Sequence, residues 1–155
     1  MSKGKNIAFG SVGIIVLLAI AIVIGGFGSG ITGAVTSGSS DYVKLQLSEI
    51  TDTAKWYTYD SAGTEIRFFA VRASDGSIKT GFDACDVCYG SHKGYRQEGN
   101  YMVCNNCGNK YPIDGLGTEN KNPGGCWPGY LPSTISGNDL LIKRSDLTGG
   151  TWRFA

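Results

Sequence analysis

The sequence predicts an all-β fold: a small antiparallel β-sandwich with a cysteine-knuckle metal-binding subdomain, preceded by a single N-terminal transmembrane helix. Three observations support this prediction. A long apolar run lies near the N-terminus, short alternating segments between glycine-containing turns follow it, and four of the five cysteines form two C-x2-C pairs. The 155 residues suffice for one domain of ordinary size and an anchor.

The apolar run favours a membrane anchor. Residues 7–24 are 18 positions without a charge, and with Gly25–Phe27 they reach the roughly 20 apolar residues that cross a bilayer as a helix. Lys3 and Lys5 precede the run, and the next cation is Lys44. Because positive charges stay on the cytoplasmic side, this asymmetry predicts a cytoplasmic N-terminus and a domain outside the cell membrane.

The predicted organisation therefore has four parts. They are a cytoplasmic N-terminus (1–6), a single-pass anchor in the membrane lipid (7–27), a Gly/Ser-rich linker (28–40) and an extracytoplasmic β domain (41–155). Two other uses of the apolar run stay open. It resembles a signal peptide that is cleaved after small residues, or it packs with copies of itself and drives self-assembly into an extracellular filament.

Within the β domain, alternating and β-branched segments predict strands in pairs. The expected strands are 43–47, 55–59, a hairpin of 65–72 with 77–82, a hairpin of 94–97 with 101–103, a hairpin of 133–135 with 140–143, and an edge strand 152–154. No amphipathic helix is expected after residue 40. The 24 glycines suit a fold rich in turns.

Charge and side-chain chemistry exclude some classes of function. The chain has 14 Lys and Arg against 13 Asp and Glu, so charge gives no reason to expect a nucleic-acid partner. It also offers no Ser/His/Asp set and no paired carboxylate motif. We therefore expect a binding or carrier protein, not an enzyme.

The cysteine spacing predicts a metal centre. Cys85 and Cys88 form one C-x2-C pair, and Cys104 and Cys107 form another after 15 intervening residues. Such a turn directs two thiolates at one point, and two turns on neighbouring hairpins complete a tetrahedron. The predicted metal-binding loops are 83–108 and 124–129.

Disulfides are the alternative, because exported cysteines often pair. A bond within C-x2-C closes a very short loop and gains little stability, however, and five cysteines cannot all pair within one chain. Cys126 and His92 are further candidates, either as additional metal ligands or as residues that support the ligands. For Cys126 the simpler interpretation is a small buried residue in a tight loop, and for His92 a surface residue.

Four thiolates suit an iron–sulfur cluster, mononuclear iron or zinc. Iron would make the centre an electron carrier, whereas zinc would make it a structural staple. A thiol–disulfide oxidoreductase fits less well, because its C-x2-C normally opens a helix and no helical pattern follows Cys88 or Cys107.

The chain closely resembles the FtrD-like family of membrane iron–sulfur proteins over about residues 43–147. The residues that carry the resemblance are Glu65–Phe69, Phe82–Cys88, Gly94–Gly99, Val103–Gly108 and Gly124–Cys126. The resemblance implies a membrane-tethered protein that transfers electrons, with a redox partner or a metal transporter in the membrane and a link to iron handling.

A second resemblance concerns architecture. Rieske domains carry two ligand pairs at a similar spacing on hairpin loops, then a covering loop, a Leu-Pro and a closing hairpin. Here the covering loop is Gly124–Gly129, followed by Leu131-Pro132. The resemblance implies a Rieske-like arrangement in which Cys88 and Cys107 replace the histidine ligands, and four thiolates would lower the potential of a two-iron cluster.

Overall fold

The structure is a computed structural model that describes residues 33–34, 40–122 and 124–155. The predicted cytoplasmic N-terminus, the anchor 7–27 and most of the linker 28–40 lie outside the described residues. Within the described part of the chain, no helix combines the length and hydropathy needed to cross a membrane.

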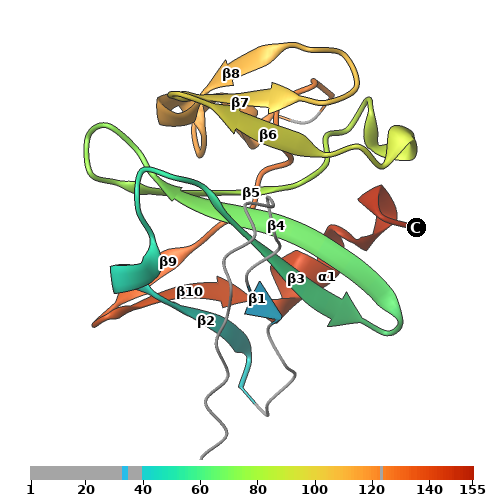
Figure 1. Ribbon diagram of the computed structural model, residues 1–155. Coiled ribbons are helices and arrows are strands. Elements are labelled where there is room, and N and C mark those ends of the chain that lie inside the picture. The colour runs from blue at the N-terminus through green and yellow to red at the C-terminus, as the bar shows by residue number, and fades with distance from the viewer. Residues whose placement is uncertain (1–32, 35–39, 123) are drawn as a thin grey trace, which may run out of the picture.

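The described residues form three small sheets (Figure 1). In spatial order, the first sheet contains β1 (Gly33–Ala34), β3 (Lys55–Ser61), β4 (Thr64–Arg72) and β5 (Ile78–Phe82). The second contains β2 (Tyr42–Gln46), β10 (Asp139–Lys143) and β9 (Thr134–Ser136). The third contains β6 (Tyr95–Glu98), β7 (Tyr101–Cys104) and β8 (Lys110–Pro112). All strand pairs are antiparallel except β1 with β3.

Strand β4 is buried on both faces, which makes the first sheet the middle layer. Successive side chains of a strand point to opposite faces. Ile66 and Phe68 accordingly pack into one hydrophobic core, and Phe69 and Val71 pack into another. In Figure 1 the sheet of β6, β7 and β8 lies on one side of β4 and the sheet of β2, β9 and β10 on the other.

The two cores have different partners. The first core joins the middle sheet to β2 and β10 through residues such as Val43 and Ile142. The second core joins it to the third sheet through Tyr95 and Met102, and it also contains Cys104. The cysteine region is therefore part of the packing between two sheets.

Short helical segments lie between the strands and after the last one. They are the α-helix α1 (Arg144–Gly149) and the 3-10 turns η1 (Leu47–Glu49), η2 (Tyr89–Ser91), η3 (Ile113–Gly115), η4 (Glu119–Lys121) and η5 (Thr151–Arg153).

The predicted strands and all three hairpins are confirmed within one or two residues at most ends, except at the C-terminus. The edge strand 152–154 is wrong, because η5 occupies Thr151–Arg153. The expectation of no helix after residue 40 is also wrong, because residues Arg144–Gly149 form the short helix α1, which packs through the buried Leu147. Strand β8 and the two-residue strand β1, which lies within the predicted linker, were not expected.

Candidate metal centre

The first cysteine pair lies in the connection between the middle sheet and the third sheet. Cys85 follows β5 and is buried, and Cys88 precedes η2 and is half-buried. The backbone amide of Cys88 donates a hydrogen bond to the Cys85 sulfur at 2.9 Å. An amide that donates to sulfur favours the thiolate form, so the backbone of this knuckle is arranged for a metal ligand.

The second pair lies on the turn between β7 and β8. Cys104 ends β7 and is buried, whereas Cys107 is exposed. Gly108 follows with φ 75°, in the left-handed region that glycine adopts without strain, and its amide donates to the Cys104 carbonyl at 2.9 Å. Only this second knuckle is the tip of a hairpin, because the first joins two different sheets.

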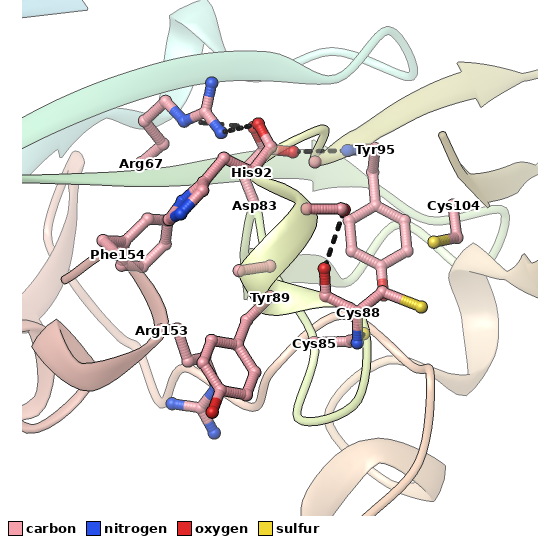
Figure 2. Close-up of a pocket in the computed structure, with 13 residues that line it drawn as sticks. Arg67, Asp83, Cys85, Cys88, Tyr89, His92, Tyr95, Cys104, Arg153 and Phe154 are labelled. Carbon is pink, nitrogen blue, oxygen red and sulfur yellow. Dashed lines mark hydrogen bonds and ion pairs between the residues drawn. The ribbon is translucent and has the colours of Figure 1, made fainter. Parts of the chain in front are cut away.

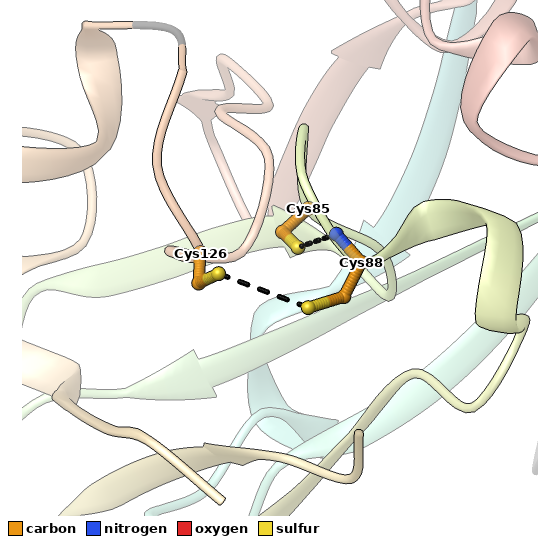
Figure 3. Close-up of side chains that lie close together, drawn as sticks. All are labelled: Cys85, Cys88 and Cys126. Atoms are coloured by element: carbon orange, nitrogen blue, oxygen red, sulfur yellow. Dashed lines mark hydrogen bonds between the residues drawn. The ribbon is translucent and has the colours of Figure 1, made fainter. Parts of the chain in front are cut away.

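A third loop brings Cys126 to the same place. The amide of Gly124 donates to Asp86 Oδ2 at 2.9 Å, and the Tyr95 hydroxyl donates to the Cys126 carbonyl at 2.5 Å. Asp86 lies inside the first knuckle, so it ties the covering loop to that knuckle. The Cys126 sulfur lies 3.8 Å from the Cys88 sulfur (Figure 3).

The five sulfurs form two overlapping groups among the described residues. One group contains Cys85, Cys88 and Cys126, and the other contains Cys88, Cys104 and Cys107; within each, all sulfurs lie within 4.8 Å of one another. The structure thus brings the four predicted ligands together around Cys88 and adds Cys126. It does not gather the four predicted ligands into one such group.

His92 belongs to neither group. Its imidazole is on an exposed residue that follows η2 with φ 53°, and its backbone carbonyl accepts a hydrogen bond from Arg67 at 3.0 Å. Figure 2 shows the His92 imidazole beside Phe154, away from Cys85, Cys88 and Cys104. Among the described residues, the contact that His92 contributes to the site is made by its backbone carbonyl.

Four residues that the sequence interpretation did not single out complete the site. Asp83 accepts a hydrogen bond from the Tyr95 amide at 2.7 Å, and Asp86 accepts two from Arg153 at 2.9 and 2.7 Å. Asp83, Tyr95 and Asp86 lie inside the motif segments of the family resemblance, whereas Arg153 lies outside them, and nothing in the sequence indicated it. Their partners are distant along the chain, so the contacts themselves could not be read from spacing.

Asp83 is a buried carboxyl group beside the site. Burial raises its pKa to about 6, against the lowering effects of the Tyr95 amide and Arg67. The Arg67 side chain lies 3.7 Å from the carboxylate, and Trp56 donates to it at 3.4 Å. This network fixes the start of β6, and with it Tyr95, against the first knuckle.

The thiols differ in acidity because their surroundings differ. Burial is the main cause that raises the pKa of Cys104 to about 11 and that of Cys126 to about 12. The pKa of Cys88 is lowered, first by the Asn106 side chain. Neighbouring thiols that compete for charge in this way are stabilised as thiolates when a cation binds them.

Aromatic rings enclose one side of the sulfurs. The rings of Tyr95 and Tyr111 lie 6.5 Å apart, and those of Tyr111 and Trp127 lie 4.9 Å apart. Burial raises the pKa of Tyr111 to about 12 and also raises that of Tyr95, so both remain neutral. The wall excludes water from the buried sulfurs, while Cys107 leaves an exposed edge.

This donor set fits a metal group. Sulfur is its only donor, which selects zinc, monovalent copper or iron–sulfur chemistry over the hard cations that prefer oxygen. Two knuckles and a covering loop supply the sulfurs, and an amide supports Cys85. This arrangement of side chains therefore suits metal binding.

Comparison with solved structures finds a weak likeness. The chain is similar to the crystal structure of the quaternary ammonium Rieske monooxygenase CntA in complex with an inhibitor, with 14% identity and a TM-score of 0.43 over 68% of this chain and 31% of that one. The chain thus spans about a third of that oxygenase, and the likeness is too weak to carry an argument. Among curated proteins, none matches.

The family comparison is stronger, because it covers most of the described domain. The model named "Membrane iron-sulfur containing protein FtrD-like" matches residues 50–154, which include all five cysteines. The chain therefore belongs to the FtrD-like family of membrane iron–sulfur containing proteins.

Proposed function

We propose that this protein is a membrane-tethered electron carrier whose centre accepts one electron from a reduced partner and passes it to an oxidised one. The observation that carries the proposal is the convergence of five cysteine sulfurs around Cys88 in a member of an iron–sulfur family. Cys85, Cys88, Cys104 and Cys107 would hold the iron, either mononuclear or as an iron–sulfur cluster. When bound, such a group supplies a reversible one-electron couple.

The chain's own residues suit this role. Buried Cys85 and Cys104 and the aromatic wall exclude solvent from one side of the site. The exposed Cys107 offers a short route to a docked partner. Cys85 and Cys104 are packed in the second core. We expect ligands fixed in this way to move little when the charge of the centre changes, which would favour fast electron exchange.

Anaerobic purification tests the proposal. The full chain is isolated in detergent, and its metals are counted by mass spectrometry. We expect stoichiometric iron, charge-transfer absorption in the visible range that bleaches on reduction with dithionite, and a paramagnetic signal in one oxidation state. Colourless protein that carries only zinc would rule out electron transfer. A C88S variant is the control and should be colourless.

A structural zinc site is the second candidate function. Cys85 and Cys104 both belong to the second core, so a metal there would staple the middle sheet to the third. In that case the chain would act as an interaction module, either anchored in the membrane or assembled into filaments through its N-terminal helix. Zinc in the purified protein, together with filaments in electron micrographs, would support this candidate.

The proposed location follows from the N-terminal sequence. We place the anchor at 7–27, with the domain outside the membrane and the redox partner or metal transporter in the same membrane. A membrane-impermeant maleimide applied to intact cells tests this topology. It should label a cysteine introduced at the exposed Ile135 and should not label one introduced at Ser2.

A further inference from the structure

Cys88 is common to the two sulfur groups. It shares one group with Cys85 and Cys126 and the other with Cys104 and Cys107. Figure 3 shows the first group, with the Cys88 sulfur directed at Cys126 across the 3.8 Å gap. A single tetrahedral ion takes four ligands from one shell. The sulfurs here number five and are arranged as two sets of three that share one member.

We propose that the centre holds two thiophilic metal ions, one in each group, with the Cys88 thiolate shared between them. This inference rests on the proposed function, because it specifies the nuclearity of the same metal centre. In this centre Cys126 is a metal ligand, as Cys107 is, and each of the two completes one group.

Hydrogen bonds at two points of the covering loop fix the position of Cys126. The Cys126 carbonyl accepts a hydrogen bond from the hydroxyl of the buried Tyr95, and the Gly124 amide donates one to the Asp86 carboxylate. Asp86 is in turn held by Arg153 through two hydrogen bonds. The contacts of Cys126 and Gly124 are made by backbone groups of the loop, so they set its path. Together they fix the loop on the first knuckle and direct the fifth sulfur at Cys88.

Charge is compatible with two ions. With one divalent ion bound by four thiolates, the fifth cysteine stays a neutral thiol. With two divalent ions, all five cysteines bind as thiolates, and the four positive charges leave a single negative charge at a site where Cys85 and Cys104 are 1% and 2% exposed.

The neighbouring arginines do not balance the charge of the thiolates. Arg67 and Arg153, which line the same pocket (Figure 2), face Asp83 at 3.7 Å and Asp86 at 2.7 Å. Each is therefore already paired with a carboxylate. In a centre with two ions, the charge that balances the thiolates would therefore come from the metal ions themselves.

Cadmium titration of the reduced, metal-free full chain in detergent tests the proposal. Cadmium is a thiophilic divalent probe whose binding to thiolates gives a charge-transfer band in the ultraviolet, and native mass spectrometry counts the bound ions. We expect two ions per chain for the wild type and one for C126S. The matched variant C107S, which shortens the other group, should also bind one, and C88S should lose tight binding of both.

A second readout does not depend on how the variants fold. Wild-type protein is loaded with one or two equivalents of cadmium, treated with iodoacetamide, and its alkylated cysteines are identified by mass spectrometry. Two equivalents should protect all five cysteines. A wild type that saturates at one ion, with Cys126 alkylated, would overturn the two-ion centre and leave the four-cysteine carrier intact. Failure to bind any cadmium would remove the proposed function as well.

Discussion

Asp86 connects three parts of the site through one carboxylate. One oxygen accepts from Arg153 and the other from the Gly124 amide, and both charged side chains are largely buried, at 15% and 12% exposure. We expect D86N to lower the free energy of unfolding by about 2–3 kcal/mol, because it leaves the guanidinium without its charged partner. It should also speed the alkylation of Cys126 in metal-free protein, because the covering loop loosens.

The matched control for this prediction is E98Q. Glu98 pairs with Arg96 at 2.6 Å, but these side chains are 38% and 50% exposed. Exposed pairs contribute less than about 1 kcal/mol. Urea unfolding of both variants makes the comparison, and equal effects would show that Asp86 acts only as a surface charge.

Asp83 should make the stability of the metal-free protein depend on pH. Its pKa is raised by burial from 3.8 to about 6, so the folded state holds a proton that the unfolded state has released. Stability should therefore fall as pH rises from about 4 to about 6, by on the order of 3 kcal/mol, and level off above. The D83N variant should lack this slope. An unchanged slope in D83N would mean that Arg67 keeps the carboxylate ionised throughout.

At the scale of the element, Gly149 and Gly150 at the end of helix α1 differ in the space that they leave for a side chain. A Cβ on Gly150 would overlap the ring of Phe82, whereas one on Gly149 would meet nothing within 4 Å. We expect G150A to cost about 1–3 kcal/mol through overpacking of the first core. G149A should be neutral or stabilising by up to about 1 kcal/mol, because alanine favours the helix. Thermal unfolding of the pair tests this, and equal melting temperatures would contradict the close approach.

Strand β4 and the C-terminal segment differ in how far local sequence decides structure. The run EIRFFAVR has strong β propensity, and both faces of it find apolar cover, so local preference and packing agree. Residues 152–154 also look β-prone, yet Arg153 reaches Asp86, which is 67 positions away. The ion pair and the turn at Gly150 override the local preference, and spacing along the chain carried no sign of either.

At the scale of the whole molecule, the same distinction applies to the site. The two C-x2-C pairs were predictable, because each is a local turn whose spacing decides its geometry. The grouping of Cys126 with Cys85 and Cys88 was not, because it depends on how the third sheet and the covering loop dock on the middle sheet. The predicted β-sandwich with a cysteine-knuckle subdomain is observed as three sheets, in which the middle sheet is shared because both faces of β4 are covered.

This layering predicts that metal affects one half of the domain more than the other. Cys85 and Cys104 belong to the second core, whereas the first core contains no cysteine. A ligand that binds only the folded state adds about 2.7 kcal/mol of stability at a hundred times its dissociation constant. We expect most of that gain in the third sheet and in the packing of Phe69 and Val71, because local opening there separates the ligands.

Hydrogen exchange measures the difference directly. On anaerobic removal of metal by a chelator, amides of β6 and β7 should lose protection several-fold or more, whereas those of β2 and β10 should change little. A C88S variant, which cannot join the two groups, should show no response to the chelator. Equal loss of protection in β2 and β6 would instead mean that both cores open together, so that the centre stabilises the domain as one cooperative unit and the three sheets have no independent stability.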